Sequence, residues 1–138
     1  MKPRTYATLD TGSDAKTPCK EEAMPWHPVA RAATEPPHVT PLHAATHRGC
    51  LASPVGQTTD WHPAPSKQCV MVLTGSMEVE AGDGETRTCT PGSVLVVTDG
   101  DGVGHKTRVV GAQEVLLVWV PIPSLMTSLH TSCGTSVA

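Results

Sequence analysis

QCVMVLTGSMEVEAGDGETRTCTPGSVLVVT, residues 68–98, is the stretch that decides the fold. Residues 69–74 form an almost continuous apolar run, which is typical of a strand in the interior of a sheet. Residues 76–81 alternate instead, with Met77 and Val79 on one face and two glutamates on the other. This alternation predicts an antiparallel strand with one face in the core and the other in water.

Turns that contain glycine or proline separate the predicted strands. Gly82-Asp83-Gly84 supplies the residues that a tight hairpin needs, and Pro91-Gly92 marks the next turn. The glycine-rich loop of residues 99–104 then leads into another strand. Strands after this hairpin are predicted at residues 85–90, 93–98, 105–110 and 114–120. Short strands joined by such turns, with no convincing helix, predict an all-β sandwich or barrel.

The two ends of the chain differ from this region in composition. Residues 1–37 are rich in proline, threonine, alanine and charge, and they show no sustained period of 2 or 3.6. We therefore expect a loosely ordered N-terminal arm there, which drapes over the barrel or over a partner subunit. The barrel is predicted over residues 38–123, with the positions of its first strands left ambiguous within residues 39–55. Residues 124–138 are predicted to be a polar C-terminal tail.

Length and charge bound the class of protein. A chain of 138 residues is long enough for one domain and short for two. Its 13 acidic and 10 basic residues are scattered without blocks, which argues against a nucleic-acid partner. No apolar run approaches the roughly 20 residues that span a bilayer, and residues 1–10 lack the apolar stretch of a secretory signal. We therefore expect a cytoplasmic protein without a membrane partner.

The five cysteines include no C-x-x-C pair. Their odd number and wide spacing argue against a disulfide framework and against a thiolate zinc site. Cys69 and Cys89, which lie inside predicted strands, are better explained as buried free thiols.

Histidines and glycines recur at fixed spacings across the barrel region. The pattern G-x5-H-x-H-x3-E-x6-G is matched in register, with two departures in residue type, by Gly56, His62, Ala64, Gln68 and Gly75. The pattern G-x5-P-x-G-x2-H-x3-N is matched in part, with two extra residues before the histidine, by Gly92, Thr98, Gly100 and His105. One such match arises readily by chance in a chain with 12 glycines and 7 histidines, but two in the right order on predicted strands are more specific.

These two patterns are the motifs of cupins. The segments W-H-P-A-P at residues 61–65 and G-H-K-T-R at residues 104–108 also resemble a subgroup of small single-domain cupins. The resemblance covers about residues 48–122 and implies a single-domain, jelly-roll-like β-barrel. Its mouth is expected to hold a small molecule near His62, Gln68 and His105.

The resemblance also implies a metal site. By register, the ligands of a divalent ion such as Zn, Fe, Ni or Mn are His62, Gln68 and His105, while Ala64 contributes none. Two imidazoles and a neutral amide leave the charge of the ion without compensation, so we expect the metal to be weakly bound or absent.

Without a metal, the same residues still support proton transfer. His62 and His105 are candidate catalytic acid and base groups, because imidazole exchanges protons near neutral pH. Gln68 is a candidate for orienting a substrate carbonyl or enolate, and Trp61 and Trp119 are candidates for lining the substrate pocket. The alternative for the two tryptophans is ordinary core packing.

The expected function is therefore an enzyme of specialised small-molecule metabolism: an isomerase, a lyase or dehydratase, a decarboxylase or a cyclase. The alternatives are a non-catalytic sensor or carrier, a metal-dependent dioxygenase, and a structural dimer module. A homodimer is expected in each case, because open sheet edges favour pairing with a partner.

Two charged features of the second motif region have simpler explanations. Asp99-x-Asp101 lacks the further ligands of a calcium loop and is interpreted as part of a glycine-rich connection. Lys106 and Arg108 alternate with His105 along the strand, so they are expected on the opposite, solvated face.

Overall fold

The structure is a computed structural model and describes residues 4–14, 16, 18–28 and 38–123. Every regular element in these ranges is a strand, which confirms the all-β prediction. The described residues include no helix long and apolar enough to cross a membrane. The predicted tail at residues 124–138 lies outside the described residues.

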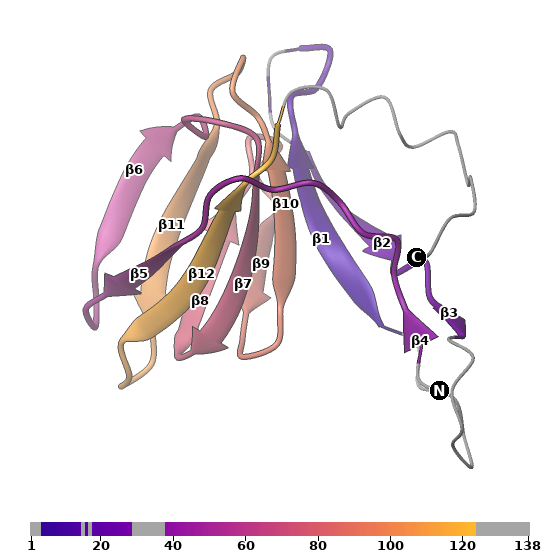
Figure 1. Cartoon of the computed structure of the whole chain (residues 1–138). Coiled ribbons are helices and arrows are strands. Elements are labelled where there is room, and N and C mark those ends of the chain that lie inside the picture. The colour runs from indigo at the N-terminus through magenta and orange to yellow at the C-terminus, as the bar shows by residue number, and fades with distance from the viewer. Residues whose placement is uncertain (1–3, 15, 17, 29–37, 124–138) are drawn as a thin grey trace.

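Two facing sheets make up the barrel (Figure 1). The larger has the strand order β2-β1-β10-β7-β12-β5 and the smaller the order β6-β11-β8-β9, while β3 and β4 form a separate short pair. The strands are β1 (Thr5–Asp10), β2 (Cys19–Ala23), β3 (His27–Pro28), β4 (His38–Val39), β5 (Gly49–Ser53), β6 (Thr58–His62), β7 (Gln68–Thr74), β8 (Ser76–Glu80), β9 (Thr86–Cys89), β10 (Val94–Thr98), β11 (His105–Val110) and β12 (Val115–Pro121).

The predicted hairpin after β8 is confirmed. The N–H of Ala81 donates to the carbonyl of Glu85 at 2.8 Å, and the N–H of Gly84 donates back to the carbonyl of Ala81 at 3.0 Å. These turn bonds set the register in which β8 and β9 pair, with Met77 opposite Cys89.

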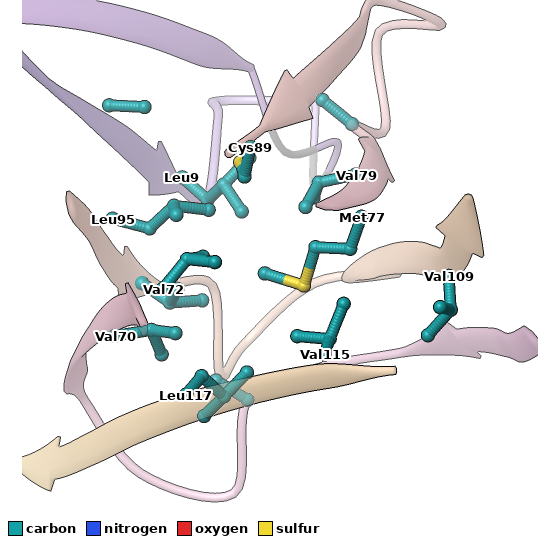
Figure 2. Packing of buried hydrophobic residues seen from close by; sticks show 14 residues of the cluster. Leu9, Val70, Val72, Met77, Val79, Cys89, Leu95, Val109, Val115 and Leu117 are labelled. Carbon is teal, nitrogen blue, oxygen red and sulfur yellow. The ribbon is translucent and has the colours of Figure 1, made fainter. Parts of the chain in front are cut away.

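Small aliphatic side chains from both sheets fill the core (Figure 2). The buried apolar residues are Ala7, Leu9, Ala64, Val70, Val72, Met77, Val79, Ala81, Cys89, Leu95, Val97, Val109, Val115 and Leu117. They recur at every second position of their strands, so one face of each sheet packs inward and the other faces out. Cys89 is a buried free thiol, as predicted, and burial raises its pKa to about 11, whereas Cys69 is only half-buried.

The predicted N-terminal arm, residues 1–37, contains strands in its described part. Part of this segment is β1, which pairs in parallel with β10 and places Leu9 beside Val97. Leu9 is only 1% exposed. The sequence hid this strand because Ala7 and Leu9 are its only buried positions, too few to show a period.

Leu9→Ala is expected to destabilise the protein by about 2–5 kcal/mol, since it removes a buried leucine from the core. Leu42→Ala is the matched control, because Leu42 is exposed, and it should change stability by less than about 0.5 kcal/mol. Urea unfolding of both variants measures the difference. Equal midpoints would show that β1 does not belong to the cooperative fold.

Candidate functional site

Two histidines meet on the inner face of the smaller sheet. His62 ends β6 and His105 begins β11, and the two are direct partners in the register of these strands. Their ring centroids are 4.6 Å apart, with the ring planes tilted by 55°. His105 is only 6% exposed. The predicted convergence of these two imidazoles is therefore seen in the structure.

An irregularity in the pairing and a glycine bring the rings together. The register of β6 against β11 shifts between His105 and Thr107, so β6 carries an extra residue just before His62. Gly104 precedes His105 with a φ of +85°, and a Cβ there would overlap the carbonyl oxygen of His62. Only glycine allows the two backbones to approach so closely in this conformation.

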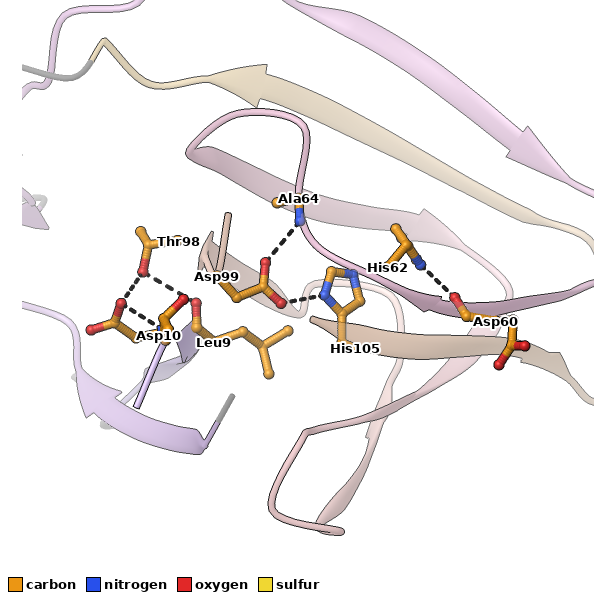
Figure 3. Close-up of polar contacts among 9 residues, drawn as sticks. Leu9, Asp10, Asp60, His62, Ala64, Thr98, Asp99 and His105 are labelled. Atoms are coloured by element: carbon orange, nitrogen blue, oxygen red, sulfur yellow. Dashed lines mark hydrogen bonds and ion pairs between the residues drawn. The ribbon is translucent and has the colours of Figure 1, made fainter. Parts of the chain in front are cut away.

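A buried carboxylate orients His105 (Figure 3). Asp99, fully buried in the loop after β10, lies with its Oδ2 2.6 Å from Nδ1 of His105. Its other oxygen, Oδ1, accepts the backbone N–H of Ala64 at 3.0 Å. The carboxylate thus holds the Nδ1 proton of His105, which leaves Nε2 as the free ring nitrogen.

His62 is held by a backbone group in the same way. Its Nδ1 lies 2.7 Å from the carbonyl oxygen of Asp60, and because a carbonyl can only accept, Nδ1 carries the proton (Figure 3). Both histidines therefore carry the proton on an anchored Nδ1, and the hydrogen bonds described for the two rings leave Nε2 of each without a partner.

Sequence reasoning missed the partner of His105. The sequence indicates only a glycine-rich connection at residues 99–104; that connection is present, but its first residue, Asp99, also turns inward to the imidazole. The one available signal was an acidic residue at the end of a strand, six positions before a motif histidine. Nothing in that spacing indicates burial.

Comparison with known proteins now identifies the family. A model of the family described as Cupin domain matches residues 51–121. The chain belongs to the cupin family. Comparison with curated proteins gives no match.

Several solved structures resemble this cupin. The Cnp3 cupin domain of Schizosaccharomyces pombe is 13% identical with a TM-score of 0.49, over 91% of this chain and 87% of that one. A cupin domain of Bordetella pertussis Tohama I is 20% identical with a TM-score of 0.45, over 73% and 96%. A conserved protein of unknown function from Streptococcus pyogenes is 19% identical with a TM-score of 0.44, over 62% and 71%.

The remaining predicted site residues of this cupin are spread over both sheets. Gln68 begins β7 on the opposite sheet, in register with Val97, and it is not among the polar contacts of the two histidines within the described ranges. Trp61 lies beside Lys106, whose Nζ is 5.7 Å from the centroid of the tryptophan ring, and Trp119 lies on β12. The histidines form a cluster with Asp99, a residue that the prediction did not include.

The donor set of this cupin fits a divalent metal poorly. Two imidazole Nε2 atoms are available, but in the part of the chain that the structure describes no group of three or more His, Cys, Asp or Glu side chains could hold an ion. At the motif positions of the other ligands stand Ala64, which has no donor, and Gln68, a neutral amide on the facing sheet. We therefore derive no chemical step from a metal.

The outer face of the same sheet is polar. Arg108 pairs with Glu78 at 2.6 Å and Lys106 with Glu80 at 4.0 Å, so both cations lie on the face opposite His105, as predicted. A groove of about 580 Å³ runs over this face, lined by these four residues together with residues of β6 and β9. Its cations are already matched by carboxylates.

Proposed function

We propose that this cupin is an enzyme of specialised metabolism that transfers a proton within a small oxygenated compound. The observation that carries the proposal is the buried Asp99–His105 pair with the ring of His62 beside it. Isomerisation, dehydration, decarboxylation and cyclisation all need a proton moved between carbon and oxygen. The two imidazoles supply an acid and a base for that transfer.

The chemistry follows from the hydrogen bonds of the two rings. With one imidazole protonated and the other neutral, the first donates its Nε2 proton to the carbonyl oxygen of the substrate, and the second accepts at Nε2 a proton from the carbon next to the carbonyl group, which leaves the enol. When His105 is the acceptor, the imidazolium that forms keeps its Nδ1–H on the Asp99 carboxylate, which stabilises the new charge at a distance of 2.6 Å. The carbonyl of Asp60 holds His62 in place through either state.

The role proposed for Gln68, orienting the substrate oxygen, rests on its place at the start of β7. From that position it belongs to the sheet that faces the histidines. It is an auxiliary part of the proposal, since no contact with either histidine supports it.

The proposal is tested with acetone in D2O, by following deuterium incorporation at its carbon atoms by NMR. Wild-type protein should exceed an equal concentration of free imidazole by about 10²–10⁴-fold, and His62→Ala and His105→Ala should each remove that excess. His47→Ala is the matched control, because His47 is exposed and bonded only to its neighbour Thr46 among the contacts described.

Two outcomes would contradict an enzymatic role. Exchange no faster than with free imidazole would remove the proposed chemistry. If the protein catalysed no exchange and a small molecule that raised its melting temperature were recovered chemically unchanged, the cupin would be a sensor or carrier instead.

A further inference from the structure

Two large apolar side chains face the interior of the barrel and yet are exposed. Leu51 of β5 pairs with Leu117 of β12, and residues paired across neighbouring strands project from the same side of a sheet. Leu117 belongs to the core, so Leu51 projects inward as well. Leu51 is nevertheless 52% exposed, because β5 is the last strand of its sheet.

Trp119 lies next to Leu51 on the same side. It pairs with the core residue Val70 on one neighbouring strand and with Gly49 on the other, and it is 37% exposed. A Cβ on Gly49 would touch Cε3 of the indole at 3.5 Å, so the ring lies against the bare backbone of β5. We call Gly49, Leu51 and Trp119 the open inner face.

The topology places the open inner face opposite the histidines. β5 is the edge strand of the larger sheet and β6 the edge strand of the smaller, and the two are consecutive in the chain. The turn between them is closed by a bond from the N–H of Gln57 to the carbonyl of Pro54. The inner sides of these two edges therefore look toward each other, one carrying the apolar residues and the other His62.

No lysine or arginine of β5, β6, β11 or β12 projects between the open inner face and the histidines. The inward positions of β5, β6, β11 and β12, within the described residues, are Gly49, Leu51, Ser53, Thr59, His62, His105, Thr107, Val109, Val115, Leu117, Trp119 and Pro121. Lys106 and Arg108 lie on the outer side and are paired with Glu80 and Glu78. The inward positions of these four strands therefore hold no arginine or lysine that could offset the loss of hydration of a carboxylate or phosphate.

We propose that the open inner face binds the substrate, and that this substrate is a neutral, flat, mainly apolar carbonyl or phenolic compound. The indole of Trp119 offers a planar surface for an aromatic ring, and Leu51 extends that surface. The oxygen of the compound would then point to the histidines. This inference rests on the proposed function for what happens to the substrate, but not for its binding.

The binding test uses 2-naphthol and 2-naphthoate, two bicyclic probes that differ chiefly in charge, with affinity measured by NMR titration. The neutral probe should bind about 10-fold or more tightly than the anion, and Trp119→Ala should weaken 2-naphthol by a similar factor. Leu73→Ala is the control, because Leu73 is 48% exposed and alternates with the core residue Val72 along β7, so it lies on the outer side of its sheet and should change nothing.

A second variant keeps the inference testable if Trp119→Ala fails to fold. Leu51→Lys places a cation on the open inner face and should reverse the preference toward 2-naphthoate, whereas Leu42→Lys, at an exposed position outside the strands, should not. Equal affinities of all variants for both probes would overturn the inference. So would a change from dimer to monomer in Leu51→Lys without binding of either probe, because the face would then be an interface between two copies.

The failures of the two proposals are separable. If 2-naphthol binds as expected but acetone shows no catalysed exchange, the inference stands and the proton-transfer function fails. If acetone is exchanged through the histidines but Trp119→Ala and Leu51→Lys leave the affinity for both probes unchanged, the function stands and the inference fails.

Discussion

Replacing Asp99 with Asn is expected to lower the rate of acetone exchange by about 10²–10⁴-fold while the protein stays folded. The reason is the number of acceptors that the side chain offers. Asp99 accepts both the N–H of Ala64 and the Nδ1–H of His105, whereas an asparagine offers one acceptor oxygen and one donor NH2 group. The backbone N–H of Ala64 cannot change, so the amide oxygen stays there and the NH2 group faces His105.

His105 must then present Nδ1 as an acceptor, and its proton moves to Nε2. The nitrogen that would take the substrate proton is thereby blocked. Losing the charged hydrogen bond should also destabilise the fold by about 1–3 kcal/mol, which urea unfolding measures. Asp101→Asn is the control, because Asp101 is exposed in the same loop and should leave both quantities unchanged. Full activity in Asp99→Asn would exclude Asp99 as the residue that positions His105.

Gly104→Ala is expected to destabilise the protein by at least about 3 kcal/mol. Two costs combine at this position. The first is the positive φ of +85°, and the second is the overlap of the new methyl group with the carbonyl of His62. Relief of that overlap requires β6 and β11 to separate at the point where the two imidazoles meet.

Gly84→Ala isolates the first cost. Gly84 has a φ of +87°, but nothing lies within 4 Å of a Cβ built there, so only about 1–2 kcal/mol should be lost. The two variants are compared by urea unfolding, with the slope of the transition checked for constancy. A loss in Gly104→Ala no greater than in Gly84→Ala would show that the contact with His62 does not constrain the site.

The strands from β7 to β12 could be predicted from the sequence because each carries a local signal. β8 alternates Met77 and Val79 with two glutamates, and the turn at residues 82–84 has glycines where a hairpin needs them. β1 and β2 carry no such signal. β1 has only two buried positions, and both are apolar. β2 is a charged edge strand, and nearly all of its residues are exposed. Its charges are those expected of a protected edge, which local propensity does not reveal.

The candidate site likewise contains residues that could be predicted from the sequence and residues that could not. His62 and His105 could be predicted because motif spacing reports which residues share a barrel wall. Asp99 could not, because its burial depends on how the loop of residues 99–104 folds back toward Ala64. The exposure of the inward-facing Leu51 could not be predicted either, because it follows from the position of β5 at the edge of its sheet and not from any residue type.

The tautomer of His105, that is, which of its two ring nitrogens carries the proton, tests the proposed site most directly. This measurement needs no substrate. A long-range ¹H–¹⁵N correlation spectrum of histidine-labelled protein, recorded where the imidazoles are neutral, reports which ring nitrogen carries the proton. We expect His105 and His62 to carry it on Nδ1 and to present a bare Nε2, and we expect Asp99→Asn to move the proton of His105 to Nε2 while His62 keeps its own. A wild-type His105 that carries its proton on Nε2, or that is unaffected by the loss of the carboxylate, would contradict the site described here.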